Sequence, residues 1–259
     1  AAYLLDQRAD PNAIGAGYTA LHAATLRGDE RLVEALLKHG ADPNTRLESG
    51  TPLRRTSQDW AFNPALVSAT PYWLAAYFRE PNIMRDLVAA GADPRMTTLE
   101  LWRPVFERAG GVGPPYDAGG FVPPLVAALR GPVNKGRFFN TESIDPDSDE
   151  RKALDTARVA LELGAEVNQA DARGDTALHT AAQRNFTTLV RLLADAGADL
   201  NLGNASGRTP LQLAISAAAG RESSPVLADR APSGNSAEVL RELGAVEPEK
   251  TEDESTATR

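Results

Sequence analysis

The chain of 259 residues contains no cysteine, only three histidines and no long uninterrupted apolar run. Without cysteine it cannot form disulfides, thiolate metal sites or a cysteine nucleophile, and three histidines argue against a histidine-rich metal site. We therefore expect neither a metal nor a cofactor. A membrane-spanning helix needs about 18 or more consecutive apolar residues, so we expect no membrane insertion.

Aromatic residues and positive charge are also scarce. There are three Trp, five Tyr and seven Phe, and Ala and Leu supply most of the apolar content, which suits thin helices packed closely. The net charge of −8 is a poor match for nucleic acid, whose backbone is bound by Lys and Arg. The lack of thiols fits a reducing or an oxidising compartment. We therefore expect a soluble protein, either cytoplasmic or periplasmic or secreted.

One phrase recurs along the chain, each time after an apolar helical pattern. It is read at residues 40–44 (GADPN), 91–94, 164–168 and 197–201, with a variant at 8–12 and a remnant at 244–245. The shared Ala is 32 residues apart between Ala9 and Ala41, and 33 apart between Ala165 and Ala198. The Gly that opens the phrase suits the left-handed position that ends a helix.

A second phrase lies between copies of the first. It is read at residues 19–24 (TALHAA), 70–76, 176–182 and 209–214, with a weaker copy at 122–128 (VPPLVAA). Thr is a good helix N-cap, and Pro fits the first helical turn. Together the two phrases resemble the ankyrin repeat, whose period is about 33 residues. The resemblance covers about residues 2–245, and over 168–201 it is almost position for position.

The resemblance implies an all-α fold, a solenoid of stacked helix-turn-helix units with β-hairpin-like loops. A single unit cannot bury its apolar face, so neighbouring units must stack. The length alone allows one large or two small domains, but the repeats predict one elongated array over 1–245. Its expected parts are a half repeat at 1–12 and full repeats at about 13–44, 45–94, 95–168, 169–201 and 202–245.

Three of the spacings exceed 33 residues, which predicts insertions. We place them at 47–68, at 95–121 together with 131–150, and at 221–235. The first contains residues 50–55 (GTPLRR), which imitate a repeat start without the following Ala pair. In the second we start the repeat at Val122, because residues 120–123 copy the start at 207–210. An alternative alignment starts it at Thr97 and treats 114–150 as one insertion.

The two ends differ in character. Tyr3, Leu4 and Leu5 fit the second helix of a repeat whose first helix is missing. Terminal repeats normally carry polar caps, and this one does not. We therefore expect the parent protein to continue upstream of Ala1. Residues 246–259 contain five acidic and two basic residues and should form a disordered acidic tail. The GADPN form of the first phrase and the long insertions between repeats look similar to those of bacterial ankyrin proteins.

No group of residues predicts catalysis. The resemblance makes His22 and His179 structural, because this His bonds the neighbouring hairpin backbone, and His39 precedes a helix-ending Gly, where a partly cationic ring suits the helix dipole. Residues 145–150 resemble half a calcium loop, but the required Gly and Glu are absent, so we read them as an acidic flank of a helix starting near Arg151. The glycosylation sequons at Asn185 and Asn204 are short enough to arise by chance. We expect no enzyme.

Ankyrin-type arrays bind partners on the concave side, with hairpin tips and the exposed ends of first helices. Carried over repeat by repeat, the resemblance assigns partner binding to Tyr18, Leu26, Arg27, Tyr77, Phe78, Phe121, Leu129, Arg130, Arg173, Asp175, Gln183, Arg184 and Arg208. Tyr, Phe and Arg are enriched at binding hot spots. Alternatively, Tyr77 and Phe78 only pack under the neighbouring insertions.

The expected function is a scaffold that binds another protein, with apolar and acidic groups on the partner. The alternative is a non-catalytic subunit or domain of a larger enzyme or assembly, with its insertions packed on a permanent partner. Both homo-oligomers and hetero-oligomers are compatible with the sequence.

Overall fold

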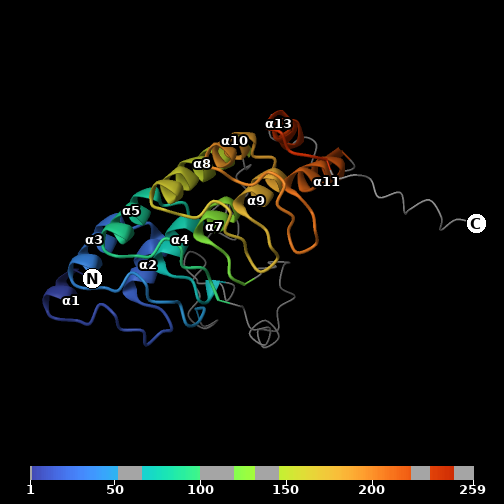
Figure 1. Cartoon of the computed structure of the whole chain (residues 1–259). Helices are drawn as coiled ribbons and strands as arrows, with labels where there is room; N and C mark the ends of the chain where they lie inside the picture. Colours follow the sequence, from blue (N-terminus) through green and yellow to red (C-terminus); the bar gives the residue numbers. More distant parts are fainter. Residues whose placement is uncertain (1, 52–65, 100–119, 132–145, 223–233, 248–259) are drawn as a thin grey trace, which may run out of the picture.

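Three of the helices begin where the second phrase predicts a capping Thr. The computed structural model describes residues 2–51, 66–99, 120–131, 146–222 and 234–247 (Figure 1). Thr19, Thr70 and Thr176 are N-caps, and the hydroxyl oxygen of each accepts a hydrogen bond from the backbone N–H three residues later. In two of these caps that later residue is a His whose ring bonds back to the cap backbone. This reciprocal pairing satisfies two backbone N–H groups that a helix start leaves unpaired.

The helices of the described ranges form five antiparallel pairs preceded by one short helix. In chain order they are α1 (Ala2–Asp6), α2 (Ala20–Arg27), α3 (Glu30–Lys38), α4 (Pro71–Tyr77), α5 (Pro81–Ala89), α7 (Pro124–Arg130), α8 (Pro146–Glu162), α9 (Ala177–Arg184), α10 (Thr187–Asp195), α11 (Pro210–Glu222) and α13 (Ser236–Glu242).

These pairs stack side by side into a curved, two-layered array. Figure 1 shows an outer row of α3, α5, α8, α10 and α13 and an inner row of α2, α4, α7, α9 and α11, with the loops projecting beyond the inner row. Each inner helix packs against its outer partner and against the inner helices of the adjacent repeats. The result is the all-α repeat solenoid that the sequence predicts.

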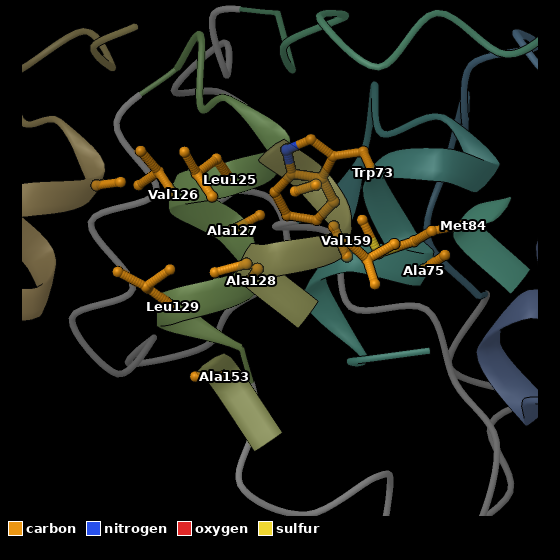
Figure 2. Packing of buried hydrophobic residues seen from close by; sticks show 14 of the residues in the cluster. Trp73, Ala75, Met84, Leu125, Val126, Ala127, Ala128, Leu129, Ala153 and Val159 are labelled. Atoms are coloured by element: carbon orange, nitrogen blue, oxygen red, sulfur yellow. The ribbon is translucent and has the colours of Figure 1, made fainter. Parts of the chain in front are cut away.

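The core is built from small and medium apolar side chains that lie between the rows. Figure 2 shows Trp73 and Ala75 of α4 and Met84 of α5 with residues 125–129 of α7 and with Ala153 and Val159 of α8. The inner helix α7 is buried over 124–129. Alanines at the helix contacts allow close approach. Each fully buried Leu stabilises the fold by about 1.5–3 kcal/mol.

The loops of the first phrase are joined by asparagine side chains. Asn44 Nδ2 donates to Gly91 O at 2.9 Å, and Asn44 Oδ1 accepts from Asp93 N at 2.9 Å. Asn12 and Asn168 make the same pair of bonds to the Gly and Asp of the phrase that comes next in their part of the array. One exposed side chain thus ties each of these loops to the following repeat, without adding core volume.

Several sequence predictions fall wholly or partly outside the described residues. These are the imitation repeat start at 50–55, most of the insertions, and the tail beyond residue 247. Within the described part, α8 begins at Pro146 rather than near Arg151. The proposed acidic flank therefore contributes Asp149 and Glu150 to the first five residues of the helix itself, and both are buried.

Candidate functional site

Where the structure describes them, the loops before the inner helices form a ledge on the side where partner binding is predicted. Backbone bonds join successive hairpin tips: Glu48 N donates to Gly17 O at 2.8 Å, Ala172 N to Gly120 O at 2.9 Å, and Ala205 N to Arg173 O at 2.8 Å. In two tips a side chain sets the turn. Asp171 accepts from Arg173 N and Asp175 N, and Asn204 Oδ1 accepts from Ser206 N and Arg208 N. The ledge is therefore preorganised.

The thirteen predicted residues differ in accessibility. Arg27, Phe121, Gln183 and Arg208 are exposed. A second group is half-buried and comprises Tyr18, Tyr77, Arg130, Arg173, Asp175 and Arg184. Leu26, Phe78 and Leu129 are buried, with 8%, 8% and 0% of their surface exposed. The prediction of partner contact is corrected for these three, because the core already occupies their side chains.

The burial of Leu129 results from a one-residue error in the predicted register. The N-cap of α7 is Pro123 and the first helical residue is Pro124, so Val122 is not the equivalent of the capping Thr. Leu129 then corresponds to Ala182, which faces the core, and Arg130 corresponds to Gln183. The sequence left the register open at this point, because Pro is favoured at the first helical position and either Pro123 or Pro124 could fill it.

The same shift gives Phe121 a different place in its hairpin. It corresponds to Gly174 and Gly207, whose φ angles are 74° and 72°, and it shares their left-handed backbone with φ 59°. A bulky residue seldom adopts this conformation. Phe121 nevertheless remains 45% exposed. Strained residues of this kind cluster at functional sites.

A further exposed apolar residue, absent from the sequence prediction, accompanies Phe121. Thr98 N donates to Val122 O at 3.2 Å, and Val122 N donates to the Thr98 hydroxyl at 3.0 Å. Next to these bonds, Leu99 on the other segment is 49% exposed. No periodic pattern marks Leu99, since it becomes a neighbour of Phe121 only through the long-range pairing.

Tyr77 and Phe78 form an aromatic cluster with Trp73 at the end of α4. The rings of Trp73 and Tyr77 stack with centroids 5.3 Å apart, and Tyr77 meets Phe78 edge-on at 5.2 Å. Trp73 Nε1 donates to Val122 O at 2.9 Å, which ties the cluster to the hairpin of Phe121. Packing in this cluster accounts for the burial of Phe78, whereas part of the Tyr77 side chain remains accessible.

Three of the predicted arginines take part in ion pairs within the protein. Arg130 Nη2 lies 2.7 Å from Asp171 Oδ2 and 3.6 Å from Asp175 Oδ2, and Arg173 Nε lies 3.6 Å from the same Asp175 oxygen. Arg184 Nη2 lies 2.5 Å from Asp149 Oδ2. Burial lowers the pKa of Arg184, Asp149 opposes that shift, and Arg79 adds to it.

The histidines lie where the resemblance implies. His22 and His179 are fully buried, and His179 Nε2 lies 3.1 Å from Arg208 O in the next hairpin. Burial lowers the pKa of His22 to about 4, and hydrogen bonding of the ring to the backbone of Ala69 and of Thr45 opposes this shift. His39 is exposed, with Nε2 3.5 Å from Asp6.

Neither sequon fits a glycosylated asparagine. Asn185 is 4% exposed, and its amide bonds the backbone of Gly234 and Ser236. The Asn204 amide donates to Asp175 and accepts from the backbone N–H groups of two residues in its own hairpin. Among the described residues there is no group of three or more potential metal ligands and no helix long and apolar enough to cross a membrane.

Comparison with known families gives two matches. Residues 16–46 match the ankyrin-repeat model, and residues 148–236 match the model for ankyrin repeats in three copies. The chain is 26% identical over 77% of its length to E3 ubiquitin-protein ligase KEG of Arabidopsis thaliana, covering 16% of that protein. It is 38% identical over 38% of its length to the Neurogenic locus Notch protein of Drosophila melanogaster, covering 3% of it.

A bacterial relative is also similar over part of the array. Protein PhlB of Serratia liquefaciens is 44% identical over 26% of this chain, and the match covers 30% of PhlB. The chain thus spans less than a third of each of these three relatives. Ankyrin repeats generally mediate contacts between proteins. The repeated phrases, the stacked helix pairs and the matching models together show that this chain belongs to the ankyrin-repeat proteins.

Proposed function

We propose that the chain binds a protein partner along the inner row and its hairpin ledge, with Phe121 as an apolar anchor. The observation that carries the proposal is the conformation of Phe121. Gly adopts a positive φ at no steric cost, and Gly stands at the equivalent positions 174 and 207. A half-exposed aromatic residue at this position lowers the folding stability of the unbound protein. This cost fits a side chain that is needed for binding.

The neighbourhood of Phe121 supplies the rest of the proposed surface. Leu99 and Tyr77 extend the apolar area, and Arg173 is joined to the same stretch of ledge by the bond from Ala172 N to Gly120 O. Arg27 and Arg208 are exposed toward the two ends of the array. A partner segment with an apolar side chain and flanking carboxylates matches this chemistry.

The test begins with affinity capture by the full-length protein and identification of the retained proteins by mass spectrometry. Purified partner is then titrated by calorimetry into wild type, F121G and R27E/R208E. We expect F121G to lower affinity at least about tenfold, or about 1.4 kcal/mol, without lowering Tm, since lost contacts are offset by relief of backbone strain. R27E/R208E should lower affinity and make it less salt-dependent.

The matched control is R31E, which reverses an exposed charge on the outer helix α3 and should bind like wild type. Unchanged affinity of F121G would refute the anchor role. Arg184 is excluded from the test, because its ion pair with the buried Asp149 makes a charge reversal there a test of folding. A partner that co-purifies stoichiometrically and is needed for solubility would favour the alternative of a permanent subunit.

A further inference from the structure

Three inter-helix turns of the array contain a residue in the left-handed conformation. These are Gly28 after α2 (φ 65°), Arg79 after α4 (φ 60°) and Asn185 after α9 (φ 62°). In each of these repeats the second helix follows within three residues. Gly adopts this conformation freely and Asn tolerates it, whereas Arg is disfavoured there. We therefore infer that the contacts of the Arg79 side chain offset the cost of this backbone conformation.

The residue in this turn correlates with the construction of the following repeat. After Gly28 comes the pair α4/α5, whose helices are separated by three residues. After Arg79 comes α7/α8, with residues 131–145 between the helices, and after Asn185 comes α11/α13, with 223–235 between them. A polar side chain thus replaces Gly wherever the second helix of the next repeat lacks a short covalent connection to the first.

Arg79 contacts both sides of the interruption between α7 and α8. Its Nε donates to Ala128 O near the end of α7 at 3.0 Å. Its Nη1 donates to the Asp149 carboxylate and to Asp149 O in the first turn of α8. The side chains of Arg79 and Asp149 are each 4% exposed, and Arg184 Nη2 binds the second Asp149 oxygen at 2.5 Å.

Asn185 makes the corresponding contacts at the start of α13. Its Nδ2 donates to Gly234 O at 2.5 Å, and its Oδ1 accepts from Ser236 N at 2.7 Å. The fit is close, because a Cβ on Gly234 would lie 2.5 Å from Cγ2 of Thr187. Here the bonds are neutral, whereas the Arg79 contacts are ionic. A charged side chain and a neutral side chain therefore make equivalent contacts from the same position in the inter-helix turn.

We propose that Arg79 and Asn185 act as clasps. Each side chain holds the second helix of the following repeat in place, a task that a short inter-helix turn performs in the uninterrupted repeats. The start of α8 and the start of α13 are then each held by a side chain contributed by the preceding repeat, in addition to the packing of these helices on their neighbours. Because α8 lies between α5 and α10, release of the Arg79 clasp would uncouple the two halves of the outer row. The array thus contains two points at which loss of one side chain would favour local opening of an outer helix.

The substitution R79G tests this with opposite expected signs. If the Arg79 side chain were idle, Gly would relieve the strained backbone, and exchange of amide hydrogens would slow or stay the same. If it is a clasp, we expect the α8 amides to exchange at least about tenfold faster, with α3 unchanged. N185G should accelerate exchange in α13, with α3 again unchanged. G28N, which adds a side chain before an uninterrupted repeat, is the matched control and should leave α5 unchanged.

The measurement is hydrogen exchange followed by mass spectrometry on the full chain. Unchanged or slower exchange in α8 of R79G overturns the proposal, and so does an equal acceleration in every helix, which would assign Arg79 to general stability. Should R79G fail to fold, R79K is measured in its place. It keeps the charge but loses the forked donor set, so selective acceleration in α8 supports the clasp, and uniform or absent acceleration overturns it.

Discussion

His179 Nε2 lies 3.1 Å from the backbone carbonyl oxygen of Arg208 in the next hairpin, while its Nδ1 accepts from Thr176 N at 3.2 Å. One buried ring therefore closes the cap of α9 and connects two repeats. The fifth repeat uses Gln212 in the same cap, where Oε1 accepts from Thr209 N at 2.9 Å. An acceptor at this position thus completes the cap of α9 and of α11, whereas the Thr70 cap of α4 has Trp73 there and lacks this second bond. The His ring adds the connection between repeats.

This relationship predicts graded effects of substitution at His179. H179A should destabilise the protein by about 2–4 kcal/mol, since it leaves a cavity and removes the bonds to both hairpins. H179Q should cost only about 1 kcal/mol, because Gln can reproduce the cap. H39Q, at an exposed position, should stay within about 0.5 kcal/mol. Urea unfolding of the three variants checks the order, and equal losses for H179A and H179Q would contradict it.

His22 predicts how stability depends on pH. Burial lowers its pKa from 6.5 to about 4, so the folded protein keeps this ring neutral. Between these two values the unfolded chain binds a proton that the folded chain does not, and the free energy of unfolding therefore falls as pH decreases from about 6.5 to about 4. The expected loss from His22 is roughly 3 kcal/mol.

Urea unfolding at several pH values from 4 to 7.5 measures this slope. H22Q cannot titrate and should be less stable than wild type at pH 7.5 but less sensitive to acid. His179 also has a lowered pKa owing to burial, so some slope should remain in H22Q. An unchanged slope in H22Q would show that His22 does not cause the acid sensitivity.

The sequence predicts the helices of this protein better than it predicts the chemistry between them. The Thr caps are local signals within one repeat, and they place the starts of α2, α4 and α9 correctly. The bond from Arg79 to Asp149 spans 70 residues and cannot be read from spacing. Predicted binding residues such as Phe78 and Leu129 are buried for the same reason, since burial depends on neighbouring repeats and on the register at Pro123.

Arg95 occupies the place that Asn44 and Asn168 fill in their loops. Its Nε donates to Gly164 O at 3.3 Å, but a guanidinium has no acceptor for the backbone N–H of the following repeat. Its ion pair with Glu166, at 3.6 Å, is more than half exposed on both sides and is worth little. We therefore expect R95N to stabilise the protein by about 1 kcal/mol.

The reverse substitution N168R is the control and should destabilise by a similar amount, since it removes the bonds to Gly197 and Asp199. Thermal unfolding at pH 7.5 compares both variants with wild type. A lower Tm for R95N would assign more weight to the Arg95–Glu166 ion pair than its exposure allows.

Glu150 caps a helix that does not cap itself. The N-cap residue of α10 is Phe186, which makes no side-chain cap bond. Glu150 Oε1 instead accepts from Thr188 N at 2.6 Å and from Leu189 N at 3.2 Å. A buried carboxylate at a helix N-terminus also interacts favourably with the helix dipole. We expect E150A to cost about 2 kcal/mol, because the buried N–H of Leu189 and the partly buried N–H of Thr188 lose their acceptor.

The matched comparison is D29A, which removes the exposed cap of α3, a bond of 3.1 Å to Leu32 N, and should cost about 1 kcal/mol or less. Hydrogen exchange locates the damage: E150A should accelerate the first-turn amides of α10, and D29A those of α3. If E150A accelerated only α8, the residue would stabilise its own helix and not the neighbouring one. E150Q retains an acceptor oxygen and should recover part of the loss, which separates the hydrogen bonds from the effect of the charge.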